Sequence, residues 1–77
     1  MARYYFDISK DGSLVPDGEG TELPTLDSAR EECAHVLAEI AKGALPGNSN
    51  RELVITVKLD GKAVLKARLL YETTSLV

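Results

Sequence analysis

The sequence predicts an α+β fold in two layers, with one helix packed on a four-stranded, mainly antiparallel sheet and the element order ββαββ. Apolar residues recur at steps of three and four between Leu26 and Ala44, which is typical of an amphipathic helix. Segments on both sides of this helix alternate apolar and polar residues at period two, which is typical of half-buried strands. An antiparallel sheet with the helix across one face would bury all of these apolar stripes together.

Two strands are expected before the helix, joined by a tight turn. The alternation runs from Arg3 to Ser9, and the turn residues that follow, Lys10-Asp11-Gly12-Ser13, predict a reversal of the chain. Ser13-Leu14-Val15 then returns as a short strand. Pro16 ends it, because proline cannot donate a hydrogen bond to the ladder. A loop over residues 17–20 and a briefly extended segment over residues 21–23 lead to the helix.

The helix is expected to span Leu26–Ala44. Thr25 precedes it and can accept hydrogen bonds from the first free amides, while Ser28 followed by Glu31 offers a rival capping box. Gly43 or the Pro46-Gly47 pair is expected to end the helix. Its apolar stripe consists of Leu26, Ala29, Cys33, Val36, Leu37, Ile40 and Ala44.

The last two strands are expected as a hairpin that turns at Asp60-Gly61. Odd-numbered residues are the more apolar in both strands, so both odd sets should face the helix. A two-residue turn would pair Ile55 with Lys66 and place Lys66 and Arg68 on that buried face, which is strongly unfavourable. A three-residue loop, Leu59-Asp60-Gly61, avoids this and pairs Ile55 with Leu65, and we expect this loop.

A right-handed crossover by the helix predicts the order of the strands in the sheet. The strand over 13–15 should lie at one edge, followed by the strands over 3–9, 52–58 and 63–71. The centre of the core is expected to be formed by Phe6, Ile8, Leu37, Ile40, Ile55, Val57, Leu65 and Leu69.

Length and composition exclude several classes of protein. A chain of 77 residues with 44% apolar residues is a small globular domain, and it is expected to be one domain over 1–77. Its single cysteine argues against a disulfide scaffold and against a thiolate zinc site. No apolar run is long enough to span a membrane, and Met1–Tyr5 does not resemble a signal peptide, so we expect a cytoplasmic protein without membrane partners.

The sheet face turned away from the helix is the least ordinary feature of the sequence. Residues 1–50 hold four Lys or Arg against nine Asp or Glu, whereas residues 51–77 hold five against three. By the alternation of side chains along each strand, cations, one aromatic ring and aliphatic residues gather on the outer face of the sheet, which predicts an interaction surface. Its members are Arg3, Tyr5, Val54, Lys58, Val64, Lys66, Arg68 and Leu70, with Lys62 beside them.

Other polar residues do not combine into a catalytic, cofactor-binding or metal-binding pattern. His35 is expected on the exposed face of the helix without partners, and Cys33 lies in the apolar stripe, where a free thiol packs as a small apolar group. The acidic residues Asp11, Asp17, Glu19 and Glu22 match no calcium loop. No glycine-rich phosphate loop is present.

Several segments together resemble a known family. These are the opening Arg3-Tyr4-Tyr5-Phe6-Asp7, the segment Gly20-Thr21-Glu22-Leu23-Pro24, the helix start from Leu26 to Arg30, and Arg51-Glu52-Leu53. In this order they resemble a family of short, uncharacterised bacterial proteins classed as a domain of unknown function. The resemblance implies a stand-alone bacterial cytoplasmic protein and implies no activity, cofactor or catalytic residue.

The sequence therefore favours a small non-enzymatic protein-interaction or regulatory module. A homodimer is one expected assembly and an unidentified protein partner is another. The alternative is a nucleic-acid-associated regulator that uses the basic outer face, with Arg3, Lys58, Lys66 and Arg68 along phosphates and Tyr5 under a base. The acidic net charge of −3 makes this alternative the weaker one.

Overall fold

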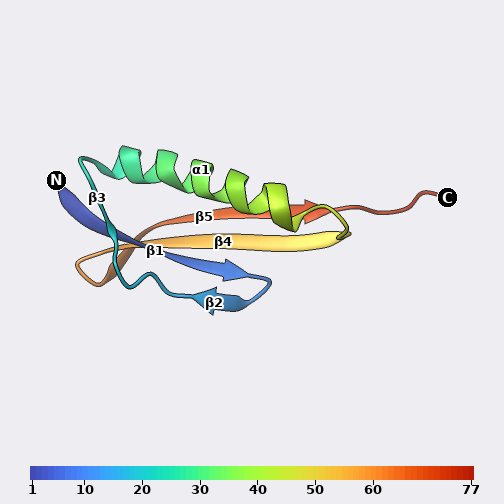
Figure 1. Cartoon of the computed structure of the whole chain (residues 1–77), viewed down its shortest axis with the longest axis horizontal. Coiled ribbons are helices and arrows are strands. Elements are labelled where there is room, and N and C mark those ends of the chain that lie inside the picture. The colour runs from blue at the N-terminus through green and yellow to red at the C-terminus, as the bar shows by residue number, and fades with distance from the viewer.

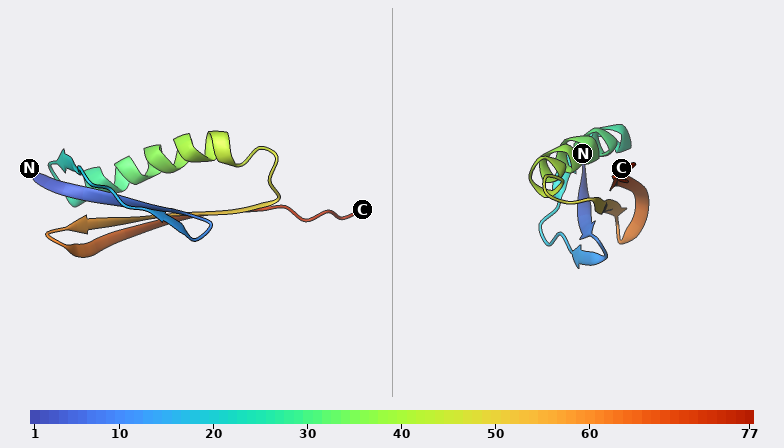
Figure 2. Two further views of the ribbon diagram at one scale, coloured as in Figure 1. Left: turned by 60° about the horizontal axis from the view of Figure 1, so that its bottom comes forward. Right: turned by 90° about the vertical axis from the view of Figure 1, so that its right-hand side faces the viewer.

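One helix lies along one face of a twisted sheet (Figures 1 and 2). The computed structural model describes all 77 residues, and the predicted α+β class is confirmed. The elements are β1 (Ala2–Lys10), β2 (Ser13–Val15), β3 (Thr21–Leu23), α1 (Leu26–Ala44), β4 (Asn50–Leu59) and β5 (Lys62–Glu72). The residues after β5 extend away from the body of the molecule (Figure 1).

The strands β2-β1-β4-β5 are neighbours in that order, and all of their pairings are antiparallel, so the predicted strand order is confirmed. The predicted number of four strands is wrong, because β3 is a fifth strand that pairs with Ala2–Tyr4 at the start of β1. The chain between β2 and β3 interrupts the pairing with β1. The sequence of β3, only three residues long, carries no periodicity that could place it in the sheet.

Both hairpins turn through two residues, Asp followed by Gly. The φ angles are 52° and 87° at Asp11 and Gly12, and 52° and 78° at Asp60 and Gly61, as a type I′ turn requires. The second turn makes Leu59 the partner of Lys62. The predicted three-residue loop is therefore wrong.

A β-bulge in β5 reconciles this short turn with a buried apolar face. Lys58 pairs with Ala63 and Val57 pairs with Leu65, so Val64 is left without a partner and the register shifts by one residue. Ile55 consequently faces Ala67, not Leu65 as expected. Beyond the bulge the odd-numbered residues share the helix side, as predicted. Lys62 does not lie on the outer face, because its partner Leu59 belongs to the helix-side set.

The helix begins and ends where the sequence predicts. Thr25 is the N-cap, and its Oγ1 accepts a hydrogen bond from the Ser28 amide at 3.0 Å, so the rival capping box is not used. The helix ends at Ala44, two residues before Pro46, which has no N–H to continue the ladder. Gly43 lies inside the last turn. The side chain of Asn48 donates to the Ala44 carbonyl at 2.7 Å and satisfies one of the free carbonyls.

The core is centred closer to the start of the helix than the sequence suggested. Phe6, Ile55 and Val57 are buried as predicted, whereas Ile8, Leu37, Ile40, Leu65 and Leu69 are half-buried. Four residues missing from the predicted centre are buried instead: Tyr4, Ala29, Cys33 and Leu53. Small side chains let a helix approach a sheet closely, so Ala29 and Cys33 mark the closest contact. The helix packs on β3, β4 and β5 and leaves part of the helix-side face of β1 and β2 open.

Candidate functional site

The outer face of the sheet brings together the residues that the sequence assigned to an interaction surface. Tyr5 is the ladder partner of Lys58, and Val54 is the partner of Arg68. Leu70 and Val64 are among the large apolar residues that stay exposed, at 63% and 39%. Arg3 lies near the start of β1, opposite Glu22 of β3.

Most cations of this face are held by carboxylates of the same face. Lys58 Nζ lies 2.9 Å from Asp7 Oδ2, and Arg68 Nε lies 3.6 Å from Glu52 Oε2. Arg3 lies 3.5 Å from Glu22 and donates to the Glu19 carbonyl at 2.7 Å. The face is therefore a mosaic of both charges and is not basic, which leaves little cationic charge for a phosphate chain. Period-two alternation also places Asp7 and Glu52 on this face, although the interaction surface expected from the sequence does not include them.

Lys66 differs from the other cations of the outer face. It is exposed and forms no ion pair within the chain. Glu72, at the end of the same strand, is also exposed and also has no ion pair. Two free charges of opposite sign thus stand six positions apart on β5, too far apart along an extended strand to meet.

Asp7 is the one buried charged residue, with 7% of its surface exposed. Its Oδ1 accepts the Asp17 amide at 3.0 Å, and its Oδ2 faces Lys58. The hydrogen bond from the Asp17 amide and the bond to Lys58 lower the pKa of Asp7, and they outweigh the opposite effect of burial. A carboxylate held ionised in this way stabilises the fold and is poorly suited to act as a general acid.

The Asp17 carboxylate takes the place of a strand partner for β1 where the chain between β2 and β3 is not paired with it. Its Oδ2 accepts the Phe6 amide, and its Oδ1 accepts the amides of Glu19 and Gly20, all at 3.0 Å. The bonds from Gly20 and Phe6 are the main reason that the pKa of Asp17 is lowered. The carboxylate is saturated by its own chain, which leaves it unsuited to a calcium ion.

The remaining acidic residues of these loops are also engaged separately. Asp11 accepts the Glu52 amide at 2.8 Å, and Arg51 Nε lies 2.8 Å from Asp11 Oδ2 as an ion pair that is not an aligned hydrogen bond. Glu22 faces Arg3. No group of three His, Cys, Asp or Glu residues could hold a metal ion.

Cys33 and His35 lie where the sequence placed them. Cys33 is 2% exposed, and burial, aided by Glu32, raises the pKa of its thiol. The uncharged thiol packs as part of the core and is a weak nucleophile. His35 is exposed on the helix.

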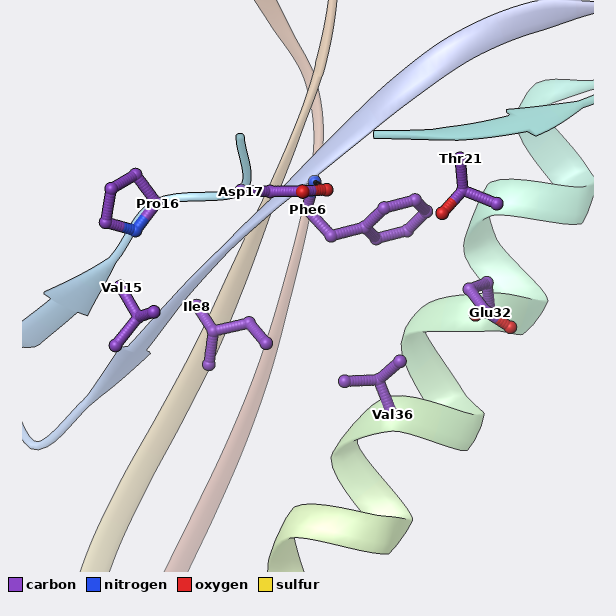
Figure 3. Close-up of a pocket in the computed structure, with 8 residues that line it drawn as sticks. All are labelled: Phe6, Ile8, Val15, Pro16, Asp17, Thr21, Glu32 and Val36. Carbon is purple, nitrogen blue, oxygen red and sulfur yellow. Dashed lines mark hydrogen bonds between the residues drawn. The ribbon is translucent and has the colours of Figure 1, made fainter. Parts of the chain in front are cut away.

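A shallow groove of about 260 Å³ runs between α1 and the β1–β2 side of the sheet. Figure 3 shows Ile8 and Val36 facing each other across it, with the Phe6 ring at its centre. Val15 and Pro16 close one side, and Thr21, Glu32 and Asp17 complete the lining. The groove exists because the helix packs on β3, β4 and β5 and does not reach over β2.

The free edge of β5 is the longest open feature of the sheet. The Asp11 amide donates to the Glu52 carbonyl at 2.9 Å, so the backbone groups of Glu52 point toward β1. Those of the next residue, Leu53, then point toward β5, and those of its partner Leu69 point back toward β4. The intervening residues of β5 present their N–H and C=O groups to the free edge. These are Lys66, Arg68 and Leu70.

Comparison with known families assigns the chain to one family. The family described as Domain of unknown function (DUF6894) matches residues 3–70, and the chain belongs to it. The resemblance noted from the sequence is thereby confirmed at the level of a domain of unknown function. No curated protein and no solved structure matches the chain. No helix has the length and apolar character that crossing a membrane requires.

Proposed function

We propose that the protein is a non-enzymatic interaction module that binds a partner strand along the free edge of β5, and that the partner is a second copy of the chain. The observation that carries the proposal is the edge itself. β5 runs for 11 residues, and its outer row of N–H and C=O groups from Lys66 to Leu70 has no partner in the chain. Such an edge is a template for strand addition.

The opposite edge of the sheet is protected, which makes β5 the exception. β2 and β3 are three residues long each, and Pro16 and the Asp17 loop interrupt the edge between them. Short strands, prolines and local distortions are the usual means of discouraging edge pairing. On β5 the bulge at Val64 and the cations Lys66 and Arg68 could serve that purpose. The bulge lies before the free row from Lys66 to Leu70, however, and Arg68 is drawn toward Glu52.

The outer face next to this edge supports a protein partner over a nucleic acid. Its cations are mostly paired with carboxylates, while Leu70 and Val64 remain exposed. The charged groups engage one another or backbone amides, an arrangement that suits binding better than proton transfer. As part of the same proposal, we place the protein in the bacterial cytoplasm, where its buried free thiol would remain reduced.

The proposal is tested by blocking the edge without disturbing the chain's own ladder. Leu70→Pro removes an amide that points to the free edge and places a ring there, whereas Leu70→Ala shortens the side chain and keeps the amide. Sedimentation equilibrium from micromolar to millimolar protein should show a dimer for the native chain and for Leu70→Ala, and a monomer for Leu70→Pro. Urea unfolding shows whether Leu70→Pro remains folded. A native chain that is monomeric throughout, or a dimer that survives in folded Leu70→Pro, contradicts the proposal.

A further inference from the structure

We infer that two copies pair antiparallel through β5 in one register, with a twofold axis at Leu69 that sets Lys66 of each copy against Glu72 of the other. The inference rests on the proposed self-association and adds the register and the residues that specify it. Three charged residues of β5 form no ion pair in their own chain: Lys62, Lys66 and Glu72. Lys62 lies before the bulge, and the inference starts from the other two, Lys66 and Glu72.

The hydrogen-bonding pattern first limits the registers. Backbone groups that point to the free edge belong to the even-numbered residues of β5 beyond the bulge, so even residues must pair with even residues. A twofold axis then passes through one residue, which faces its own copy. Each choice of that residue fixes every other pair.

Charge next separates the permitted registers. An axis at Arg68 sets identical guanidinium groups against each other, and an axis at Ala67 sets Lys66 against Arg68. Like charges directly opposite each other destabilise an antiparallel pair. An axis at Leu70 avoids this conflict and sets Arg68, which already lies near Glu52, against Glu72 of the second copy. It moves Lys66 beyond the end of the partner's β5, which is Glu72, and so shortens the paired segment.

An axis at Leu69 avoids like-charge pairs and also keeps the paired segment long. Lys66 meets Glu72 of the second copy, and Arg68 lies beside Leu70 of the second copy, which its aliphatic stem can cover while Glu52 holds its head group. On the helix side, Leu69 meets itself and the small Ala67 meets the large Tyr71. Pairing runs from Lys66 to Glu72 and joins the two sheets, with both helices on the same face.

Charge reversal tests this register against all others. Lys66→Glu or Glu72→Lys alone creates a like-charge pair at two symmetric places and should weaken the dimer about tenfold or more at low salt, while the double variant should restore it. Reversal of Lys62, which lies outside the paired segment, is the matched control and should have little effect. Single reversals that change nothing, or a double variant that fails to recover, would show that this register is wrong.

A crosslink provides a readout that does not depend on charge. Residues facing each other at a non-hydrogen-bonded antiparallel site have Cα atoms about 4.5 Å apart, which suits a disulfide. With Cys33→Ala as background, Leu69→Cys should form a covalent dimer under oxidised glutathione, whereas Tyr71→Cys should not, because it faces Ala67. If Leu70→Pro abolishes the dimer but Leu69→Cys does not crosslink, the register fails and edge pairing stands. If the native chain never dimerises, both fail.

Discussion

Deletion of Val64 tests the β-bulge and hence the whole arrangement of the β4–β5 hairpin. Val64 is the one residue of β5 between Ala63 and Leu65 that lacks a partner on β4. Its removal leaves Lys58 opposite Ala63 and Val57 opposite Leu65, so it converts the bulged hairpin into a regular one without moving any other pair. The three-residue loop expected from the sequence gives the opposite result, because the same deletion would then turn Lys66 toward Ile55 on the helix side.

The bulged hairpin and the hairpin with a three-residue loop predict very different losses of folding free energy when Val64 is deleted. In the bulged hairpin the loss is limited to the part of the Val64 side chain that is buried, since the residue is 39% exposed, which corresponds to at most about 2 kcal/mol. In the other arrangement Lys66 and Arg68 would be buried and the odd apolar set exposed, which a domain with a stability of about 5–15 kcal/mol or less would not survive.

Equilibrium urea unfolding and an amide NMR spectrum measure the difference. The variant without Val64 should remain folded, with the resonances of β1 and the distal part of β4 nearly unchanged. Deletion of Thr56 serves as the control, because this residue pairs with both Asp7 and Lys66 and its loss shifts both ladders. An unfolded protein after deletion of Val64 would refute the bulged register.

Three further predictions concern the loop and its carboxylates. Asp17→Ala removes the acceptor of three amide hydrogen bonds and should lower the free energy of unfolding by about 2–4 kcal/mol in urea, and a loss below about 1 kcal/mol would mean that the loop is held otherwise. The pKa values of Asp7 and Asp17 lie below the ordinary 3.8 in the folded state, so the two ionised carboxylates contribute fully to folding stability above roughly pH 5. This contribution is lost as the pH falls through the lowered pKa values. Asp7→Asn should make the decline less steep in acid titrations followed by circular dichroism. Gly20→Ala should destabilise by about 1–3 kcal/mol, because φ is 74° and the new Cβ would lie 2.8 Å from Arg3 Cγ, whereas Gly18→Ala, which meets nothing within 4 Å, should have little effect in the same assay.

The helix and the faces of the long strands could be predicted from the sequence because each rests on a repeated local pattern. Thr25 and the stripe from Leu26 to Ala44 defined the helix at both ends. Period-two alternation placed Leu53, Ile55 and Val57 on the buried side, where they are fully buried. The right-handed crossover then gave the strand order.

The register of the second hairpin could not be derived, because counting pairs from the turn gives the register only of a ladder without a bulge. Asp60-Gly61 favours a two-residue turn, and the apolar odd residues favour the buried face. These two preferences conflict only if neither strand carries an additional, unpaired residue. The bulge at Val64 removes the conflict, and nothing in the local sequence distinguishes that residue from its neighbours. The extended segment over residues 21–23 was expected, but its pairing with β1 was not. That pairing depends on Asp17, whose bonds to the Phe6 and Gly20 amides form only in the folded chain.

Period-two alternation correctly grouped the residues of the outer sheet face, but the charge of that face was misjudged. Listing the cations without the carboxylates of the same parity made the face look basic. Asp7 and Glu52 fall on it by the same alternation and engage Lys58 and Arg68. On this face, Lys66 and Glu72 of β5 form no ion pair within the chain. Both lie on the strand whose edge is open.

Amide hydrogen exchange along β5, measured at several protein concentrations, tests edge pairing most directly. In the monomer the amides of Ala67 and Leu69 bond to β4 and should be protected, whereas those of Lys66, Arg68 and Leu70 point to solvent and should exchange rapidly. As the concentration rises into the dimer range, these three amides should become protected while their neighbours change little. Rapid exchange of all three at every concentration up to millimolar would contradict the account.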